Sequence, residues 1–111
     1  MSVRISRRAR DDIAYIYAYL SSRQGTEAGE HFLALAEKTA SFLAANPEAG
    51  PRPRCKSRHK LLRFWVISQT NFLIYYLADE SGVSVERVLD GRRDVKRIIE
   101  RELEEPKEED E

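Results

Sequence analysis

The chain has 111 residues, 41% of them apolar, which suits one domain with a single modest core and argues against a multidomain protein. Its 19 basic and 19 acidic residues balance to a formal net charge of zero. Cys55 is the single cysteine, so no internal disulfide forms. No segment has the pattern of a signal peptide or a membrane span, and we therefore expect a protein of the reducing cytoplasm.

The first predicted elements are a short strand and a long helix. Val3 and Ile5 alternate with polar neighbours, as in a strand, and Ser6 is a residue type that favours the N-cap of a helix. The helix is predicted over residues 7–22. Its apolar residues recur at the i, i+3, i+4 and i+7 positions of one face, namely Ile13, Ile16, Tyr17 and Leu20.

A second helix follows after a break at residues 24–26 and is predicted to end near Asn46 and Pro47. One face carries residues at alternating spacings of four and three, namely Ala28, Phe32, Leu35, Thr39 and Phe42. Because the connection between the two helices is short, they must run antiparallel as a hairpin.

Three strands are predicted in the second half of the chain, over residues 61–67, 71–78 and 83–89. Short connections join them, which favours an antiparallel meander. The order β-α-α-β-β-β predicts an α+β fold in which the helical hairpin packs on one face of a small, mainly antiparallel sheet. After Gly91, the spacing of three apolar residues predicts a last helix, namely Val95, Ile98 and Ile99.

The charge is unevenly distributed along the chain. Residues 104–111 contain six acids and one lysine, a net charge of −5, so the remaining 103 residues hold 18 basic and 13 acidic side chains, a net charge of +5. The tail has no apolar residue to bury. We therefore predict a single basic domain over residues 1–103 and a disordered acidic tail. The tail either keeps the protein soluble or screens the basic surface from non-specific anions.

An ordered set of residues resembles the ParE/RelE superfamily of toxins of toxin-antitoxin systems, and within it the ParE branch of plasmid-stabilisation toxins. The resemblance covers residues 3–99. It is carried by Ala9, Asp12, Ile13, Ile16 and Tyr19, then Leu43, Pro47 and Gly50, then Arg63, Tyr75 and Tyr76, and finally the stretch Val88-Leu89-Asp90-Gly91-Arg92-Arg93-Asp94.

The resemblance implies a small toxin that a cognate ParD-like antitoxin neutralises in a hetero-oligomer. It also leaves two targets to choose between. RelE-like relatives cut messenger RNA on the ribosome, whereas ParE-like relatives are associated with inhibition of DNA gyrase.

Cutting RNA without a metal requires a general base, a general acid and cations that stabilise charge on the phosphorus. Three arginines are candidates for the cations and, more generally, for contact with the target, namely Arg63, Arg92 and Arg93. Asp90 stands where several cleaving relatives carry histidine, and an ordinary aspartate is ionised at neutral pH. We therefore expect a protein that binds its target and has no catalytic residues of its own.

The other candidates for chemistry are few. His31 lies on the second predicted helix beside Glu30, and His59 lies in a basic loop, so both are interpreted as solvated positions. One cysteine and two distant histidines offer no spacing suited to zinc, and no glycine-rich phosphate loop occurs, so we expect no metal and no cofactor.

The segment 52–63 contains six basic residues and no acid. It is either a solvated loop or, under the resemblance, a surface that faces acidic residues of the antitoxin or the target. Phe64 and Trp65 follow it on opposite faces of a strand, so one packs under the helices and the other is exposed or covered by a partner. The predicted antitoxin contacts are Tyr15, Tyr19, Arg54, Arg58, Phe64 and Trp65.

The sequence thus predicts a ParE-like toxin that inhibits DNA gyrase by binding. The alternative is a ribosome-dependent messenger RNA endonuclease of the RelE kind that uses Arg63, Arg92 and a tyrosine. A nucleic-acid-binding module is a third possibility, but the net charge of +5 on residues 1–103 is modest for such a module and disfavours it. We expect no sequence-specific nucleic-acid binding and no membrane association. Within the final motif, one arginine is predicted to pair with Asp90 or Asp94.

Overall fold

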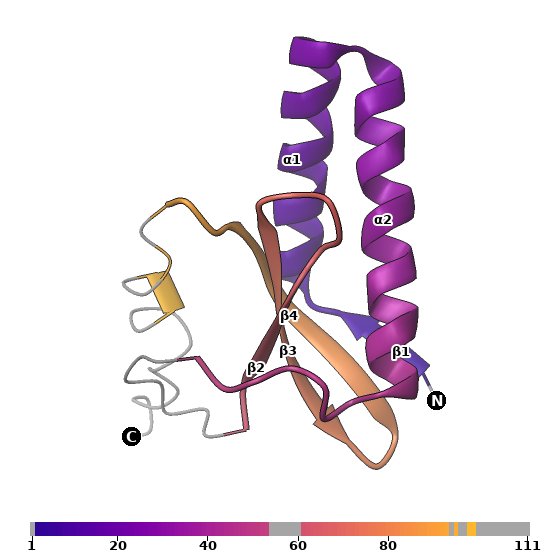
Figure 1. The fold of residues 1–111 in the computed structure, drawn as a ribbon, viewed down its shortest axis with the longest axis vertical. Helices are drawn as coiled ribbons and strands as arrows, with labels where there is room; N and C mark the ends of the chain where they lie inside the picture. The colour runs from indigo at the N-terminus through magenta and orange to yellow at the C-terminus, as the bar shows by residue number, and fades with distance from the viewer. Residues whose placement is uncertain (1, 54–60, 94, 96–97, 100–111) are drawn as a thin grey trace.

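The structure is a computed structural model that describes residues 2–53, 61–93, 95 and 98–99 (Figure 1). Its element order agrees with the predicted β-α-α-β-β-β fold. The elements are β1 (Ser2–Ile5), α1 (Arg7–Gln24), α2 (Thr26–Ala45), β2 (Arg63–Val66), β3 (Phe72–Asp79) and β4 (Gly82–Asp90).

The predicted N-cap of α1 is confirmed. The Ser6 hydroxyl accepts a hydrogen bond from the backbone N–H of Ala9 at 3.1 Å, as an N-cap does, and donates one to the carbonyl of Glu86 at 2.9 Å. One serine therefore starts α1 and also fastens that start to β4. The helix ends at Gln24, two residues later than predicted, and Gly25 turns the chain into α2 with a φ of 97°.

The sheet has the strand order β1-β4-β3-β2. β2, β3 and β4 form the predicted antiparallel meander, whereas β1 pairs with β4 in parallel. The mainly antiparallel sheet is therefore confirmed, and its one parallel pair brings the first strand beside the last. The far end of the helical hairpin projects beyond the sheet (Figure 1).

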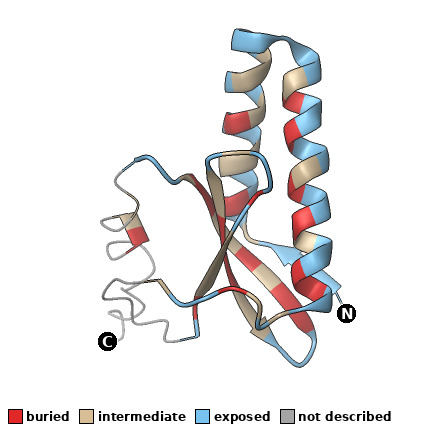
Figure 2. Cartoon of the chain, in the orientation of Figure 1, coloured by how far each residue is buried: buried red, intermediate tan, exposed pale blue. Residues whose placement is uncertain are grey.

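The main core lies between the helical hairpin and one face of the sheet, where the buried positions of both meet (Figure 2). Ala9 is fully buried because α1 crosses the sheet there, and a larger side chain would hold the helix away from the strands. The other large contributions come from Ile16, Phe32, Leu43, Ile74, Tyr76, Val83, Val85 and Val88.

A second, smaller cluster covers the opposite face of the sheet. It joins Leu62, Tyr75, Leu89 and Ile99, with Phe64, Val95 and Ile98 packed against it. Tyr75 and Tyr76 therefore point to opposite faces, as alternation predicted, but Tyr75 is only 4% exposed because residues of the chain itself cover it. Val95, Ile98 and Ile99 have the helical conformation predicted for them.

The strand bounds differ slightly from the prediction. Leu61 was expected to begin a strand but is 60% exposed, and β2 starts two residues later because Leu62 turns into the second cluster. The predicted acidic tail, the predicted helix cap Asp94 and the centre of the basic segment, residues 54–60, lie outside the described residues.

The segment that leaves α2 is held against β2 and β3 by two side chains. The Tyr76 hydroxyl donates to the carbonyl of Pro47 at 2.9 Å and accepts from the N–H of Gly50 at 3.0 Å. Arg63 donates to the Gly50 carbonyl at 2.7 Å. A side chain at Gly50 would lie 2.3 Å from the carbonyl oxygen of Phe64, so only glycine fits this close approach.

Candidate functional site

A hollow of the described surface, which we call the tyrosine hollow, lies between α1 and the end of the sheet. It has a volume of about 330 Å³. Residues of α1, of β3 and β4, and of the segment after Gly91 line it, namely Asp12, Tyr15, Ile16, Tyr19, Phe72, Val88, Leu89, Asp90, Arg93 and Ile98. Aliphatic and aromatic side chains form its floor, while charged and phenolic groups form its rim.

The α1 wall of the tyrosine hollow is a row of side chains spaced four residues apart. Tyr15 and Tyr19 stack with their ring centroids 6.5 Å apart and their planes 14° apart. The guanidinium of Arg23 lies over the Tyr19 ring, 5.1 Å from its centroid. Tyr15 is 68% exposed and Tyr19 is 44% exposed, so the row presents aromatic surface to solvent.

A partly buried ion pair holds this wall against the sheet. The carboxylate of Asp12 accepts from Nε of Arg87 at 2.7 Å and from Nη2 at 2.9 Å. It also accepts from the backbone N–H of Val88 at 2.9 Å. Because the two Arg87 bonds form a planar fork, they fix the rotation of α1 relative to β4 as well as its distance.

The opposite wall is the turn that follows β4. Gly91 donates its N–H to the carbonyl of Asn71 at 2.7 Å, and Arg93 donates its N–H to the carbonyl of Asp90 at 3.0 Å. Arg92 pairs with Asp90 through two side-chain hydrogen bonds of 3.0 and 2.9 Å, which confirms that one arginine of this motif pairs with Asp90. Those bonds from Arg92 lower the pKa of Asp90, so this carboxylate is ionised at neutral pH.

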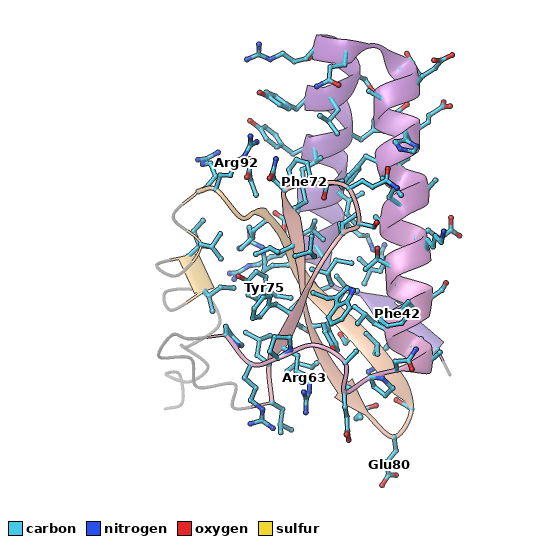
Figure 3. All side chains as sticks on the ribbon, viewed as in Figure 1. Phe42, Arg63, Phe72, Tyr75, Glu80 and Arg92 are labelled. Carbon is cyan, nitrogen blue, oxygen red and sulfur yellow. The ribbon has the colours of Figure 1, made fainter. Side chains whose placement is uncertain are left out.

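The structure divides the three arginines predicted to contact the target. Arg93 lines the tyrosine hollow, and Arg92 is paired with Asp90, which also lines it. Arg63 lies away from both in β2, and its guanidinium donates to backbone carbonyls of Gly50 and Glu48 (Figure 3). Arg92 and Arg93 therefore share a surface that does not include Arg63.

The residues predicted to contact the antitoxin are likewise divided. Trp65 packs on the helix face of the sheet, where its ring centroid is 5.5 Å from that of Phe42. Phe64 points to the other face and lies 5.8 Å from Tyr75. Alternation of these two residues is thus confirmed, and both are partly covered by the chain itself. Arg54 and Arg58 lie outside the described residues.

A second hollow of about 290 Å³ lies beside Trp65, between α2 and β2. Its lining residues are Leu35, Lys38, Thr39, Phe42, Trp65, Val66, Ser68 and Gln69. Phe42 was predicted to lie on the buried stripe of α2, but it is 42% exposed because it lies at the end of the stripe, near the edge of the sheet. Phe42 and Arg92 lie on opposite sides of the molecule (Figure 3).

Tyr15 and Tyr19 were predicted to contact the antitoxin and Arg93 the target, yet all three line one hollow. Phe72, which also lines it, was not predicted as a site residue. The only sequence signal for the aromatic row was the spacing of its members, four residues apart on the helix face next to the buried stripe.

Two further observations concern chemistry and membranes. His31 is exposed on α2, as predicted, and His59 lies outside the described residues. In the part of the chain that the structure describes, neither helix combines the length and the apolar character needed to cross a lipid bilayer.

Comparisons with known proteins identify one family and one shared fold. Residues 3–95 match the family described as ParE toxin of type II toxin-antitoxin system, parDE. A solved structure titled "Chromosomal ParDE TA system from P. aeruginosa" is similar with a TM-score of 0.66 at 20% sequence identity, over 79% of this chain and 92% of that one. No curated protein matches the sequence. Since the family match spans most of the sequence and the shared fold agrees with it, the chain belongs to the ParE toxins of type II toxin-antitoxin systems.

Proposed function

We propose that this toxin inhibits DNA gyrase in the cytoplasm by binding to it, and that a cognate ParD-like antitoxin neutralises it in a hetero-oligomer. Membership of the family implies the antitoxin partner. The observation that carries the proposal is the tyrosine hollow, whose apolar floor and charged rim suit a protein surface.

The side chains around the tyrosine hollow support binding rather than cleavage of RNA. Cleavage requires one group that accepts a proton and another that donates one. Asp12 and Asp90 are each engaged by an arginine, and the lowered pKa of Asp90 leaves it without a proton to donate at neutral pH. The two carboxylates therefore hold arginines in place.

We propose Arg92 and Arg93 as contacts with gyrase. The side chain of Arg92 is 67% exposed even though it pairs with Asp90, so it presents its free edge to solvent. Arg93 lies on the rim of the same hollow. Arg63 instead holds the segment after α2, and we assign its charge to that contact.

The test measures two activities of one purified protein in parallel, namely inhibition of supercoiling by gyrase and cleavage of ribosome-bound message. We expect inhibited supercoiling and intact message. The double variant Arg92→Ala/Arg93→Ala should lose inhibition, whereas the control Arg7→Ala, which removes an exposed arginine at the start of α1, should retain it. Cleaved message together with unaffected supercoiling would favour the endonuclease alternative and refute the proposal.

A further inference from the structure

A second surface of the molecule presents apolar side chains far from the tyrosine hollow. It consists of two hollows that share Phe42, and we call it the Phe42 face. We propose that two copies of this chain pack through the Phe42 face as a two-fold symmetric dimer. The inference goes beyond the proposed function, because Phe42 and Arg92 lie on opposite sides of the molecule (Figure 3).

The shape of the Phe42 face is that of a ridge with a hollow on each side. One is the hollow of about 290 Å³ beside Trp65, and the other has a volume of about 360 Å³. The second is lined by Phe42, Asn46, Pro47, Glu48 and Ala49. Phe42 itself is 42% exposed. Such a shape is complementary to itself, because a two-fold axis beside the ridge places the ridge of each copy against a hollow of the other.

Contacts within the chain hold the Phe42 face in shape. Trp65 supports the Phe42 ring from the sheet, with the two ring centroids 5.5 Å apart and the ring planes tilted by 31°. The turn after β2 lines the hollow on the Trp65 side. The Thr70 hydroxyl fixes this turn, because it donates to the carbonyl of Ile67 at 2.7 Å and accepts from the N–H of Phe72 at 3.0 Å. Covering this face therefore costs little conformational entropy.

The charges of the Phe42 face select a second copy as its occupant. Among the residues that line the two hollows, the charged ones are Lys38 on the Trp65 side and Glu48 on the other side of Phe42. Both are exposed, and neither forms an ion pair with any other residue that the structure describes. A two-fold axis beside Phe42 reverses the order of these charges, so Lys38 of each copy meets Glu48 of the other. The face is thus complementary to itself in charge as well as in shape.

Small side chains on α2 let the two helices approach each other. Ala34, Ser41 and Ala45 are exposed and follow one another at spacings of seven and four residues, so they lie along one side of α2. The distance between two packed helices depends on the side chains at the contact, and small ones make it short. These residues do not select a partner, but they allow Phe42 to reach the other copy.

The dimer has a consequence for binding. Because Arg92 lies on the side of each copy away from Phe42, the dimer leaves both tyrosine hollows uncovered (Figure 3). A target with two sites would bind the dimer through both hollows, and two linked contacts bind more tightly than either alone. This consequence rests on the proposed function, whereas the dimer itself does not.

Sedimentation velocity of the full chain tests the dimer. Over a series from about 1 to about 200 µM, where small interfaces associate, we expect conversion of monomer to dimer. Lys38→Glu and Glu48→Lys should each weaken the dimer at least about 10-fold, because both contacts change from attraction to repulsion. An equal mixture of the two variants should form a heterodimer of wild-type affinity, because one chain then supplies both carboxylates and the other both ammonium groups.

Two further variants complete the test. Glu30→Lys is the matched control, because Glu30 is exposed on α2 about three turns before Phe42 and lines neither hollow, so we expect wild-type association. Phe42→Ala should weaken the dimer at least about 100-fold. It also removes a contact with Trp65, whereas the charge variants alter exposed side chains and should fold normally. A chain that stays monomeric over the whole series would overturn the inference, and so would a dimer that the charge reversals do not weaken or that their mixture does not restore.

The cognate antitoxin is the rival occupant of the Phe42 face. Calorimetry with the full-length antitoxin separates the two, and we expect Phe42→Ala to bind it like the wild type. Loss of antitoxin binding in this variant, together with a wild-type chain that stays monomeric, would overturn the inference in favour of the antitoxin. A toxin that does not inhibit gyrase would refute the proposed function, while sedimentation still decides whether the chain self-associates.

Discussion

Replacing Asp12 by alanine should destabilise this protein more than any single change on the exposed face of α1. The substitution removes three hydrogen bonds, two from Arg87 and one from the N–H of Val88. The side chains of Arg87 and Asp12 are only 12% and 14% exposed, so the substitution leaves the Arg87 charge in a poorly hydrated site. Removing one partner of a buried pair costs about 3 to 5 kcal/mol, and we take the lower end, about 3 kcal/mol.

Asp11→Ala is the matched control, because Asp11 precedes Asp12 on the same helix and is exposed. Both variants gain the same helix propensity from alanine, so the difference between them isolates the contacts of Asp12. For a domain of this size, about 3 kcal/mol corresponds to a lower melting temperature by roughly 12 to 24 °C. Urea unfolding followed by far-UV circular dichroism measures the midpoint of each variant. A difference below about 0.5 kcal/mol would refute the reasoning.

Three further changes test the contacts described above. Tyr76→Phe removes both hydrogen bonds of the hydroxyl and should lower the free energy of unfolding by about 2 kcal/mol, measured by urea titration. An unchanged urea midpoint would show that this hydroxyl does not hold the segment after α2. Gly50→Ala should lower the midpoint as well, because its Cβ would overlap a backbone carbonyl, and wild-type stability would show that the segment moves freely. Arg92→Ala should raise the pKa of Asp90 towards its ordinary value in a carboxyl-carbon NMR titration. An Asp90 pKa that does not change in this variant would exclude Arg92 as the cause of the shift. In the wild type, ionised Asp90 stabilises the folded state above about pH 3.9, and this stabilisation is lost as the pH falls through the lowered pKa of the folded state.

The element order and the helical hairpin were predictable because apolar periodicity and helix caps are local signals. Ser6 caps α1 as predicted, and the resembling residues Ala9, Asp12 and Gly50 each prove to have a packing or hydrogen-bonding reason. Asp12 shows the limit of such signals. Its spacing placed it on α1, but its partner lies 75 residues away in β4, and local patterns carry no information about that contact.

The composition of the site was less predictable for the same reason. Tyr15 and Tyr19 are four residues apart on one helix, but that they line the same hollow as Arg93 depends on how α1 crosses β4 and on the turn after Asp90. Tyr75 is a second example. Alternation required it to point away from the helices, but it is buried in a cluster with Leu62, Leu89 and Ile99, which come from separate parts of the sequence.

The parallel pairing of β1 with β4 also ties the fold to the order of synthesis. Ser6, at the junction of β1 and α1, hydrogen-bonds to Glu86, 80 residues later, so the first strand has no place in the sheet until the last strand has been made. At about 5 to 20 residues per second, translation of that interval takes about 4 to 16 s. The α1 residues of the tyrosine hollow have been synthesised by then, but Val88, Leu89 and the arginines of the turn after β4 have not. A nascent toxin chain therefore lacks part of the proposed binding surface, and a chain that ends before β4 lacks it permanently.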